Sequence, residues 1–278
     1  FGGAAVEPVS LPAAVDRLTD YAAARLVARL LARRARSVDA DVVHAHHRRS
    51  AFALAHLDGP PAVATVRDFW PVCPISVYSV DCEQCTGCGD RLDDCVAYQG
   101  WDGAAEPAVK AYLLAKRRQN RAALAAADAA VFIADHLAET VGGSISLPRT
   151  VETIYNPVSV PLESDAGCEP TFVTASSLTR EKGVGTAVRA MGHLAESHPE
   201  ARLLVFGDGP LEGELRDLAA EVAPGGVEFR GRVAPETVYA AMRSATATVF
   251  PSLWAEPFGR VTVESMALGT PVVGSAVG

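Results

Sequence analysis

The sequence predicts an α/β protein with two domains, each a doubly wound parallel sheet covered by helices. Three observations support this fold class. Strand and helix patterns alternate from residue 171 to residue 250, at a spacing typical of parallel βαβ units. Short apolar runs that end in polar loops recur in the first half of the chain. Residues 161–167 have the composition of a linker, so we place one domain at residues 1–160 and the other at residues 161–278.

The composition is that of a globular protein with room for two cores. Of 278 residues, 49% are hydrophobic and 21% are charged. The 25 Lys and Arg residues and 33 Asp and Glu residues give a formal net charge of −8. This charge argues against a general nucleic-acid binder, because that role needs a basic face. The sequence shows no apolar run of about 18 residues and no export signal, so we expect a cytoplasmic protein.

The first half is expected to begin with an amphipathic helix over residues 12–36. Its apolar positions recur every three or four residues, and Arg25, Arg29 and Arg33 form a basic stripe. Such a stripe could give a peripheral contact with anionic lipid headgroups, although a solvated helix face is its more common role. The later elements of this half are strands at residues 41–46, 61–66, 129–134 and 151–155, a helix after the first of these strands, and a helix over residues 106–127.

Five of the six cysteines lie within 23 residues of one polar loop. They are Cys73, Cys82, Cys85, Cys88 and Cys95. Four clustered thiolates suit a tetrahedral zinc ion. Disulfides suit small secreted chains better, and an iron–sulfur cluster also fits closely spaced cysteines, although the spacings match no established scheme. We predict a structural zinc held by ligands from this set, and we assign it no catalytic step.

The second half alternates between strands and helices up to an acidic motif. Strands are expected at residues 171–175, 202–206, 227–230 and 246–250, and helices at residues 183–197, 211–222 and 235–243. Because the strands are parallel, the loops that follow them should lie at one edge of the sheet, where ligands bind.

The acidic motif follows the strand at residues 246–250. A helix that starts near Phe258 or Gly259 presents unpaired N–H groups and a positive dipole end, which can hold a phosphate. Glu256 and Glu264 flank this anion site, and their carboxylates accept hydrogen bonds from hydroxyls. The pair suits a ligand with a central diphosphate and polyols on both sides, such as a nucleotide sugar. By themselves, acidic residues at a helix start more often cap or solvate it.

With the segments around it, this motif resembles the donor site of retaining glycosyltransferases of family four, which have the GT-B fold. The pattern is Glu256-Pro257-Phe258-Gly259-x4-Glu264. The other similar segments keep the family's order: Tyr155-Asn156-Pro157-Val158, Glu181-Lys182-Gly183, Phe206-Gly207-Asp208-Gly209-Pro210 and Gly269-Thr270-Pro271-Val272-Val273. The stretch from Arg67 to Pro74 resembles a cysteine-containing branch of the family. The resemblance runs from about Asp41 to the chain end.

The resemblance implies two Rossmann-like domains that face a cleft and a sugar transfer from a nucleoside-diphosphate sugar to an acceptor hydroxyl, with retention. It places Lys182 on the diphosphate, Glu256 on the sugar and Glu264 on the ribose. The further donor-side positions are the amides of Phe258 and Gly259, together with Gly207, Arg232 and Val233. Arg180 is a candidate second phosphate cation, because Ser176-Ser177-Leu178 stands where the family often has Gly-Arg-Leu. Protein cations and dipoles would serve the leaving diphosphate, so no metal or cofactor is expected in the chemistry.

On the acceptor side, Asp68 follows the second strand. Its carboxylate could accept a hydrogen bond from an acceptor hydroxyl or cap the loop, and the sequence leaves both roles open. Arg67 stands where many family members have His. The acceptor would be a glycan, a lipid-linked sugar or a small molecule. The resemblance also implies that both ends of the chain are incomplete, because the family's first strand and glycine-rich turn should precede Phe1.

Two other classes of function remain open from the sequence. A catalytically degenerate protein on the same fold would bind metal and partners through its cysteine loop. A sugar-nucleotide epimerase should carry a Gly-x-Gly-x-x-Gly turn after a strand, and the sequence contains no such turn. Donor-dependent nucleotide release would separate an enzyme from the first alternative.

Overall fold

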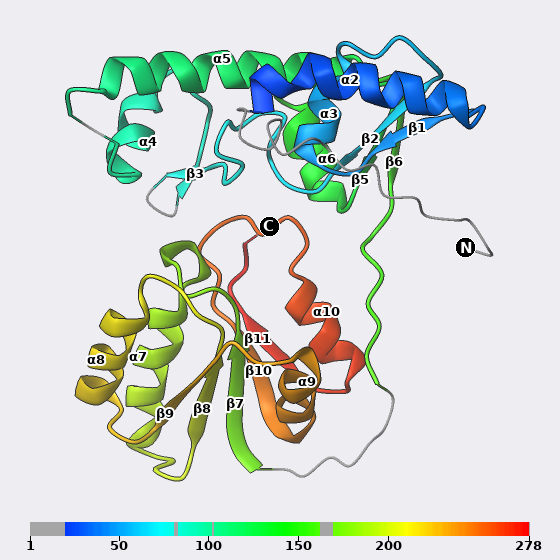
Figure 1. Ribbon diagram of the computed structural model, residues 1–278. Helices are drawn as coiled ribbons and strands as arrows, with labels where there is room; N and C mark the ends of the chain where they lie inside the picture. The colour runs from blue at the N-terminus through cyan, green and yellow to red at the C-terminus, as the bar shows by residue number, and fades with distance from the viewer. Residues whose placement is uncertain (1–19, 81–82, 102, 162–168, 278) are drawn as a thin grey trace. The chain divides into compact units, whose positions relative to one another are not determined.

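The structure is a computed structural model that describes residues 20–80, 83–101, 103–161 and 169–277 (Figure 1). The chain divides into two compact units. One comprises residues 1–78 and 86–155, and the other comprises residues 79–85 and 156–278. Among the described residues, no helix combines the length and apolarity needed to cross a membrane.

A four-stranded parallel sheet forms the centre of the first unit. Its strands lie in the order β1 (Val43–Ala45), β2 (Ala62–Val66), β5 (Ala129–Phe132) and β6 (Thr150–Thr153). Each strand begins within two residues of its expected start. The helices of this unit are α2 (Asp20–Ser37), α3 (Arg48–Leu54), α4 (Leu92–Tyr98), α5 (Glu106–Ala125) and α6 (Asp135–Gly142). The expected residues 12–19 of the first helix lie outside the described part of the chain.

Some short elements were not expected from the sequence. They are α4, α6 and the antiparallel hairpin of β3 (Ser79–Val80) and β4 (Glu83–Gln84), which clusters with the second unit. His136, which follows the predicted strand at residues 129–134, lies in α6. Short elements give too few turns for a clear period, which explains why they were missed.

Aromatic side chains after β2 fill the core beside α3 and α5. Phe69 and Trp70 are fully buried, and the Trp70 ring meets Phe52 edge to face with ring centroids 6.2 Å apart. Phe69 stacks on Tyr78 at 5.2 Å. Asn120, buried in α5, donates a hydrogen bond from Nδ2 to the carbonyl of Trp70. These contacts anchor the segment that follows β2.

A five-stranded parallel sheet forms the centre of the second unit. Its strands lie in the order β11 (Val272–Gly274), β10 (Ala245–Phe250), β7 (Glu169–Ala175), β8 (Arg202–Phe206) and β9 (Val227–Gly231). The first strand along the chain, β7, lies in the middle, with the next two on one side and the last two on the other. This is the doubly wound order that the sequence predicts, and its switch point lies between β7 and β10.

Helices cover both faces of this second sheet. The pair α7 (Val184–Ala195) and α8 (Glu212–Val222) lies on one face, and the pair α9 (Pro235–Ser244) and α10 (Arg260–Ala267) lies on the other (Figure 1). Val188, Leu203 and Leu215 belong to the core under the first pair, and Val173 and Met242 belong to the core under the second. Because helices bury both faces of the sheet, the sequences of its strands are nearly continuous apolar runs.

Two glycines let the loops of this unit approach closely. Gly183 has φ 63°, and a Cβ at this position would lie 1.9 Å from the carbonyl oxygen of Pro251. Gly207 has φ 118°, and its Cβ would lie 1.9 Å from the carbonyl oxygen of Ser176. Only glycine fits such a distance and such dihedral angles. The loop after β7 is therefore packed against both the loop after β10 and the end of β8.

Candidate functional site

The loops after β7 and β10 meet at the switch point of the second sheet. The two strands pair in parallel, so their carboxyl ends lie side by side. The loop after β7 contains a short 3-10 helix, η1 (Arg180–Lys182). The backbone N–H of Leu253, in the loop after β10, donates to the carbonyl of Glu181 at 2.8 Å. Side chains that are far apart in the sequence are thereby brought together at this edge.

Lys182 and Glu256 form an ion pair where these loops meet. The Lys182 ammonium lies 2.9 Å from Oε1 and 2.7 Å from Oε2 of Glu256. The side chains are only 22% and 17% exposed, so solvent screens the pair less than a surface pair. The sequence placed these side chains on different parts of one ligand, whereas the structure shows that they bind each other.

Trp254 and Ser252 complete the surroundings of Glu256. The indole Nε1–H of Trp254 donates to Oε2 at 2.7 Å, and the Ser252 hydroxyl lies 3.4 Å from the same oxygen. The Lys182 ammonium also lies 5.0 Å from the centroid of the Trp254 ring, within cation–π range. Glu256 therefore accepts hydrogen bonds from several directions, which fix its carboxylate.

The helix after this loop has the expected start. Gly259 is its N-cap with φ 68° and ψ 51°, and no side chain caps the first turn with a hydrogen bond. The first backbone N–H groups and the positive dipole end can therefore serve an anion. Phe258 and Gly259 lie at this start, as the sequence predicts.

Glu264 lies in the second turn of α10 and is held by two donors. Its Oε1 accepts from the Tyr239 hydroxyl at 3.2 Å and from Nε of Arg260 at 2.7 Å. Its side chain is 11% exposed. Burial, and then the Glu264 carboxylate, raises the pKa of Tyr239, so the phenol stays protonated as a donor. The orientation of this carboxylate is fixed by the protein.

A cavity of about 320 Å³ lies at the ends of β7, β8 and β9. Gly207, Arg232 and Val233 line it, together with Ser176 and Asp208. The structure thus brings together three positions that the resemblance placed near the nucleotide.

In the first unit, Asp68 lines a separate cavity of about 350 Å³. Its Oδ1 accepts the backbone N–H of Trp70 at 2.8 Å, and the Ser76 hydroxyl also hydrogen-bonds the carboxylate. Burial raises the pKa of Asp68 above its usual value, and these hydrogen bonds partly oppose the shift. Asp68 therefore caps its loop and also faces a cavity, so both roles left open by the sequence are compatible.

Comparison with known families identifies the chain. A family model described as "Glycosyltransferase Family 4" matches residues 3–160, and a model described as "Glycosyl transferases group 1" matches residues 164–278. The chain belongs to the glycosyltransferases. Together the two models cover nearly the whole chain.

Curated relatives align with part of this glycosyltransferase. A phosphatidyl-myo-inositol mannosyltransferase of Mycolicibacterium smegmatis is 42% identical over 94 residues, which are 34% of this chain and 24% of the relative. A D-inositol 3-phosphate glycosyltransferase of Acidothermus cellulolyticus is 39% identical over 122 residues, which cover 40% of this chain and 27% of the relative. The aligned part spans about a quarter of the length of these relatives.

Solved structures confirm the GT-B fold. Sucrose-phosphate synthase from Thermosynechococcus elongatus superposes with a TM-score of 0.62 at 22% identity, covering 94% of this chain and 62% of that one. HepE of Anabaena, solved in complex with UDP-glucose, gives a TM-score of 0.59 at 19% identity. The match covers 91% of this chain and 64% of HepE. At these identities the likeness shows the fold alone.

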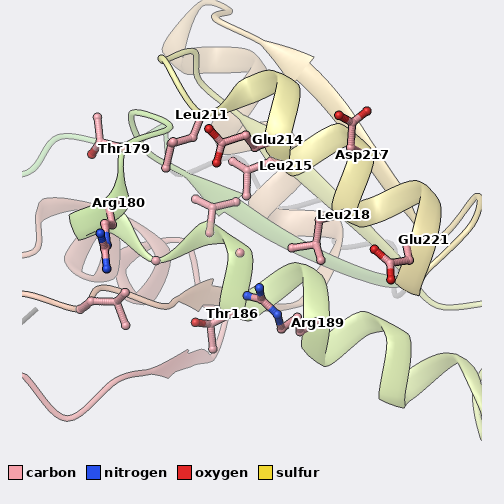
Figure 2. Close-up of a pocket in the computed structure, with 14 residues that line it drawn as sticks. Thr179, Arg180, Thr186, Arg189, Leu211, Glu214, Leu215, Asp217, Leu218 and Glu221 are labelled. Atoms are coloured by element: carbon pink, nitrogen blue, oxygen red, sulfur yellow. The ribbon is translucent and has the colours of Figure 1, made fainter. Parts of the chain in front are cut away.

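A further cavity of this glycosyltransferase lies elsewhere in the second unit, and it is larger than the two described above. It measures about 840 Å³ and runs between α7 and α8. Figure 2 shows Glu214, Asp217 and Glu221 along α8, and Arg189 on α7. Arg180 lines this cavity. The other donor-side residues expected from the sequence do not line it: Lys182, Gly207, Arg232, Val233, Glu256, Phe258, Gly259 and Glu264.

The cysteine loop is described only in part. Cys73, Cys85, Cys88 and Cys95 carry no disulfide bond. Burial raises the pKa of Cys73, which accepts the backbone N–H of Tyr78 at 3.3 Å and lies within electrostatic range of Cys88. Among the residues that the structure describes, no three His, Cys, Asp or Glu side chains are grouped as metal ligands. Cys82 lies outside those residues, and the zinc site stays a prediction.

Sequence reasoning missed several residues that hold the motif carboxylates. Trp254 and Ser252 contact Glu256, and Tyr239 contacts Glu264. A signal existed for Trp254, because an indole donor stands two residues before Glu256 in a loop already assigned to the site. Tyr239 comes from α9 and gave no local signal, since only the packing of α9 beside α10 brings it to Glu264.

Proposed function

We propose that this glycosyltransferase moves a sugar from a nucleoside-diphosphate sugar to an acceptor hydroxyl with retention of configuration. The observation that carries the proposal is the group formed by Lys182, Glu256 and the uncapped start of α10 at the sheet's switch point. A cation and backbone N–H groups in one place suit a diphosphate. Fixed carboxylates on both sides suit the hydroxyls of a sugar and a ribose.

Lys182 would stabilise the leaving diphosphate. Its ammonium has three N–H donors, and two of them are directed to Glu256. The third can reach a phosphate oxygen without breaking the pair, while Glu256 keeps acceptor capacity on Oε1 for a sugar hydroxyl. Placed charges of this kind act where negative charge develops, which is the largest contribution in many enzymes.

The nucleotide would extend from this point along the second unit. The cavity beside Gly207, Arg232 and Val233 is a candidate for the base, and Glu264 for the ribose hydroxyls. Because Tyr239 and Arg260 both occupy Oε1 of Glu264, we assign the ribose contact to Oε2. Arg180 remains a proposed second cation for the diphosphate.

The transfer step itself would take place on one face of the sugar. The bond between the anomeric carbon and the diphosphate oxygen breaks, and the acceptor oxygen bonds to that carbon from the same side. The acceptor proton passes to a departing phosphate oxygen. Asp68 would accept a hydrogen bond from the acceptor hydroxyl and orient it. No covalent intermediate on Glu256 is needed, unlike in retaining glycosidases.

The relatives support a sugar transfer without fixing its substrates. Two are named as a mannosyltransferase and as a D-inositol 3-phosphate glycosyltransferase, and one neighbour was solved with UDP-glucose. We propose a glycan, lipid-linked or small-molecule acceptor for this chain. A cytoplasmic location with peripheral membrane contact also stays a proposal. The exposed Arg25, Arg29 and Arg33 on α2 are compatible with it.

The test is a calorimetric screen of UDP- and GDP-sugars against wild-type protein and Lys182→Ala, with release of nucleoside diphosphate as the activity readout. Lys116→Ala removes the same charge in the first unit and is the control. One charge-assisted contact is worth about 1.5–3 kcal/mol, so affinity should fall about 10- to 100-fold in Lys182→Ala only. Metal binding without any nucleotide binding would instead support the degenerate metal-binding protein, which no specific observation favours at present.

A further inference from the structure

The cavity beside Asp68 is basic, although the protein is acidic. Two guanidinium groups, two imidazoles and one carboxylate line it, together with Thr65 and Trp70; the charged and imidazole residues are His46, His47, Arg48, Arg67 and Asp68. The chain as a whole has a net charge of −8. With neutral imidazoles the lining still carries one more positive than negative charge. A local excess of this sign in an acidic chain favours an anionic ligand.

Internal contacts fix most of these groups. Nη1 of Arg48 donates to the Ser76 hydroxyl at 3.2 Å, and Ser76 also hydrogen-bonds Asp68. Ser76 has φ 66°, which is unusual for a residue other than glycine. Backbone strain of this kind is found where surrounding structure demands one position. The Ser76 hydroxyl thus joins the cationic and the anionic side of the cavity.

Each of the two histidines uses its Nδ1 in a contact within the protein. Nδ1 of His47 accepts the N–H of Arg49 at 3.2 Å, so a neutral His47 carries its proton on Nε2. Nδ1 of His46 lies 3.3 Å from the Thr65 hydroxyl, which also bonds Nε2 of His44 at 2.7 Å. Neither Nε2 of His46 nor Nε2 of His47 forms a hydrogen bond with another of the described residues. A neutral His47 therefore offers an Nε2–H donor to a ligand, and Nε2 of His46 offers one when its Nδ1 accepts from the Thr65 hydroxyl.

We propose that this cavity binds the acceptor, and that the acceptor carries a phosphate close to the hydroxyl that receives the sugar. The proposal rests on the proposed function. Asp68 accepts a hydrogen bond from the reacting hydroxyl, while Arg48, Arg67 and the two imidazoles hold the phosphate. A planar guanidinium matches phosphate oxygens in a bidentate geometry that a neutral sugar does not offer. A volume of about 350 Å³ is within the range of small-ligand pockets.

The experiment compares two ligands that differ by one phosphate group. Glucose and glucose 6-phosphate are titrated into the whole protein by calorimetry, with UDP or GDP saturating so that phosphate does not bind at Lys182. We expect glucose 6-phosphate to bind at least about tenfold more tightly than glucose. Arg67→Gln and Arg48→Gln should each remove most of this preference. Arg49→Gln, the same change at the next residue of α3 and outside the cavity lining, should retain it.

Several outcomes would overturn the proposal. Equal binding of the two sugars would show that the cavity does not recognise phosphate. A preference that survives both Arg67→Gln and Arg48→Gln, or one that is lost when the nucleotide is added, would place the phosphate elsewhere. Failure of UDP, GDP and every nucleotide sugar to bind would instead contradict the proposed function, so the two failures are distinct.

A free sugar phosphate and a phospholipid headgroup present the same chemistry. The titration is therefore repeated with vesicles of phosphatidylinositol and of phosphatidylcholine. Binding to the first vesicles that depends on Arg67 would support the proposal with a lipid source, and binding of glucose 6-phosphate alone would support it with a soluble source. Arg67-independent binding to both vesicles would be a general surface effect and would count against a lipid acceptor in this cavity.

Discussion

At the scale of single residues, Lys182 and Glu256 form a partly buried ion pair in which their charges neutralise each other. Two of the three Lys182 N–H donors are directed to Glu256, and its negative charge offsets the positive charge that we propose for the diphosphate. Trp254 and Ser252 hold the carboxylate in this position. In the proposed function Glu256 thus has two opposite effects: it would orient the sugar, and its charge would compete with the phosphate for Lys182.

This competition predicts the behaviour of Glu256→Gln. The amide keeps an acceptor for Lys182 and Trp254 but loses the charge, so the ammonium becomes more available. We expect unchanged or several-fold tighter binding of free UDP or GDP by calorimetry, while release of nucleotide from the donor sugar falls by about 100-fold. Glu181→Gln, in the loop after β7 that carries Lys182, is the control. A loss of nucleotide affinity as large as in Lys182→Ala would contradict the competition.

We expect that mutation of the buried Asp68 makes the folded protein more stable. Because burial raises its pKa in the folded state, its contribution to stability is present at low pH and is lost as the pH rises through the raised value. Asp68→Asn removes this loss and keeps an acceptor for the Trp70 N–H. The thermal midpoint of Asp68→Asn should therefore exceed that of wild type at pH 7, and the difference should shrink toward pH 4. A lower midpoint at pH 7 would refute this assignment, and reduced sugar transfer should accompany the gain.

At the scale of elements, the site depends on how closely η1 approaches the loop after β10. Gly183→Ala would place a Cβ against the carbonyl of Pro251 and strain a positive φ. We expect a loss of several kcal/mol in unfolding free energy, measured by urea denaturation, together with weaker nucleotide binding. Gly213→Ala, in α8 with open space around its Cβ position, should be neutral or stabilising. Equal effects of the two substitutions would show that the close approach is not needed.

The cysteine loop carries a separate prediction at this scale. We expect about one zinc per chain, held by thiolates from Cys73, Cys82, Cys85, Cys88 and Cys95, because four clustered thiolates suit a tetrahedral zinc ion. Elemental analysis and thermal melting with a chelator test this prediction. Chelation should lower the melting of the first unit and leave nucleotide binding in the second unchanged. Protein without zinc, or with iron and sulfide, would contradict it.

At the scale of the whole molecule, the two proposed ligands belong to different units. Hydrogen exchange should show protection by UDP or GDP at residues 176–183 and 251–264, since we propose that the loops at the switch point hold the nucleotide. Glucose 6-phosphate should protect residues 46–50 and 67–76 in the first unit. Nucleotide protection concentrated on α7 and α8 would instead assign the ligand to the larger cavity of Figure 2.

The sequence by itself determined the fold class, most elements and the residues of the donor motif. Strand and helix periods are local properties, because the spacing of apolar residues within one short segment shows which of its faces are buried. The sequence could also place Glu256, Gly259 and Glu264 correctly around one helix start, since they belong to one continuous segment.

Only the tertiary structure decided which of these residues touch. Lys182 and Glu256 are 74 positions apart, and their contact requires β7 beside β10 and a glycine at position 183. The basic cavity likewise joins residues after β1 and after β2, and Tyr239 reaches Glu264 only through the packing of two helices. Such contacts depend on strand order and close approach, which no local pattern encodes, because the free energy that selects them comes from the folded chain as a whole.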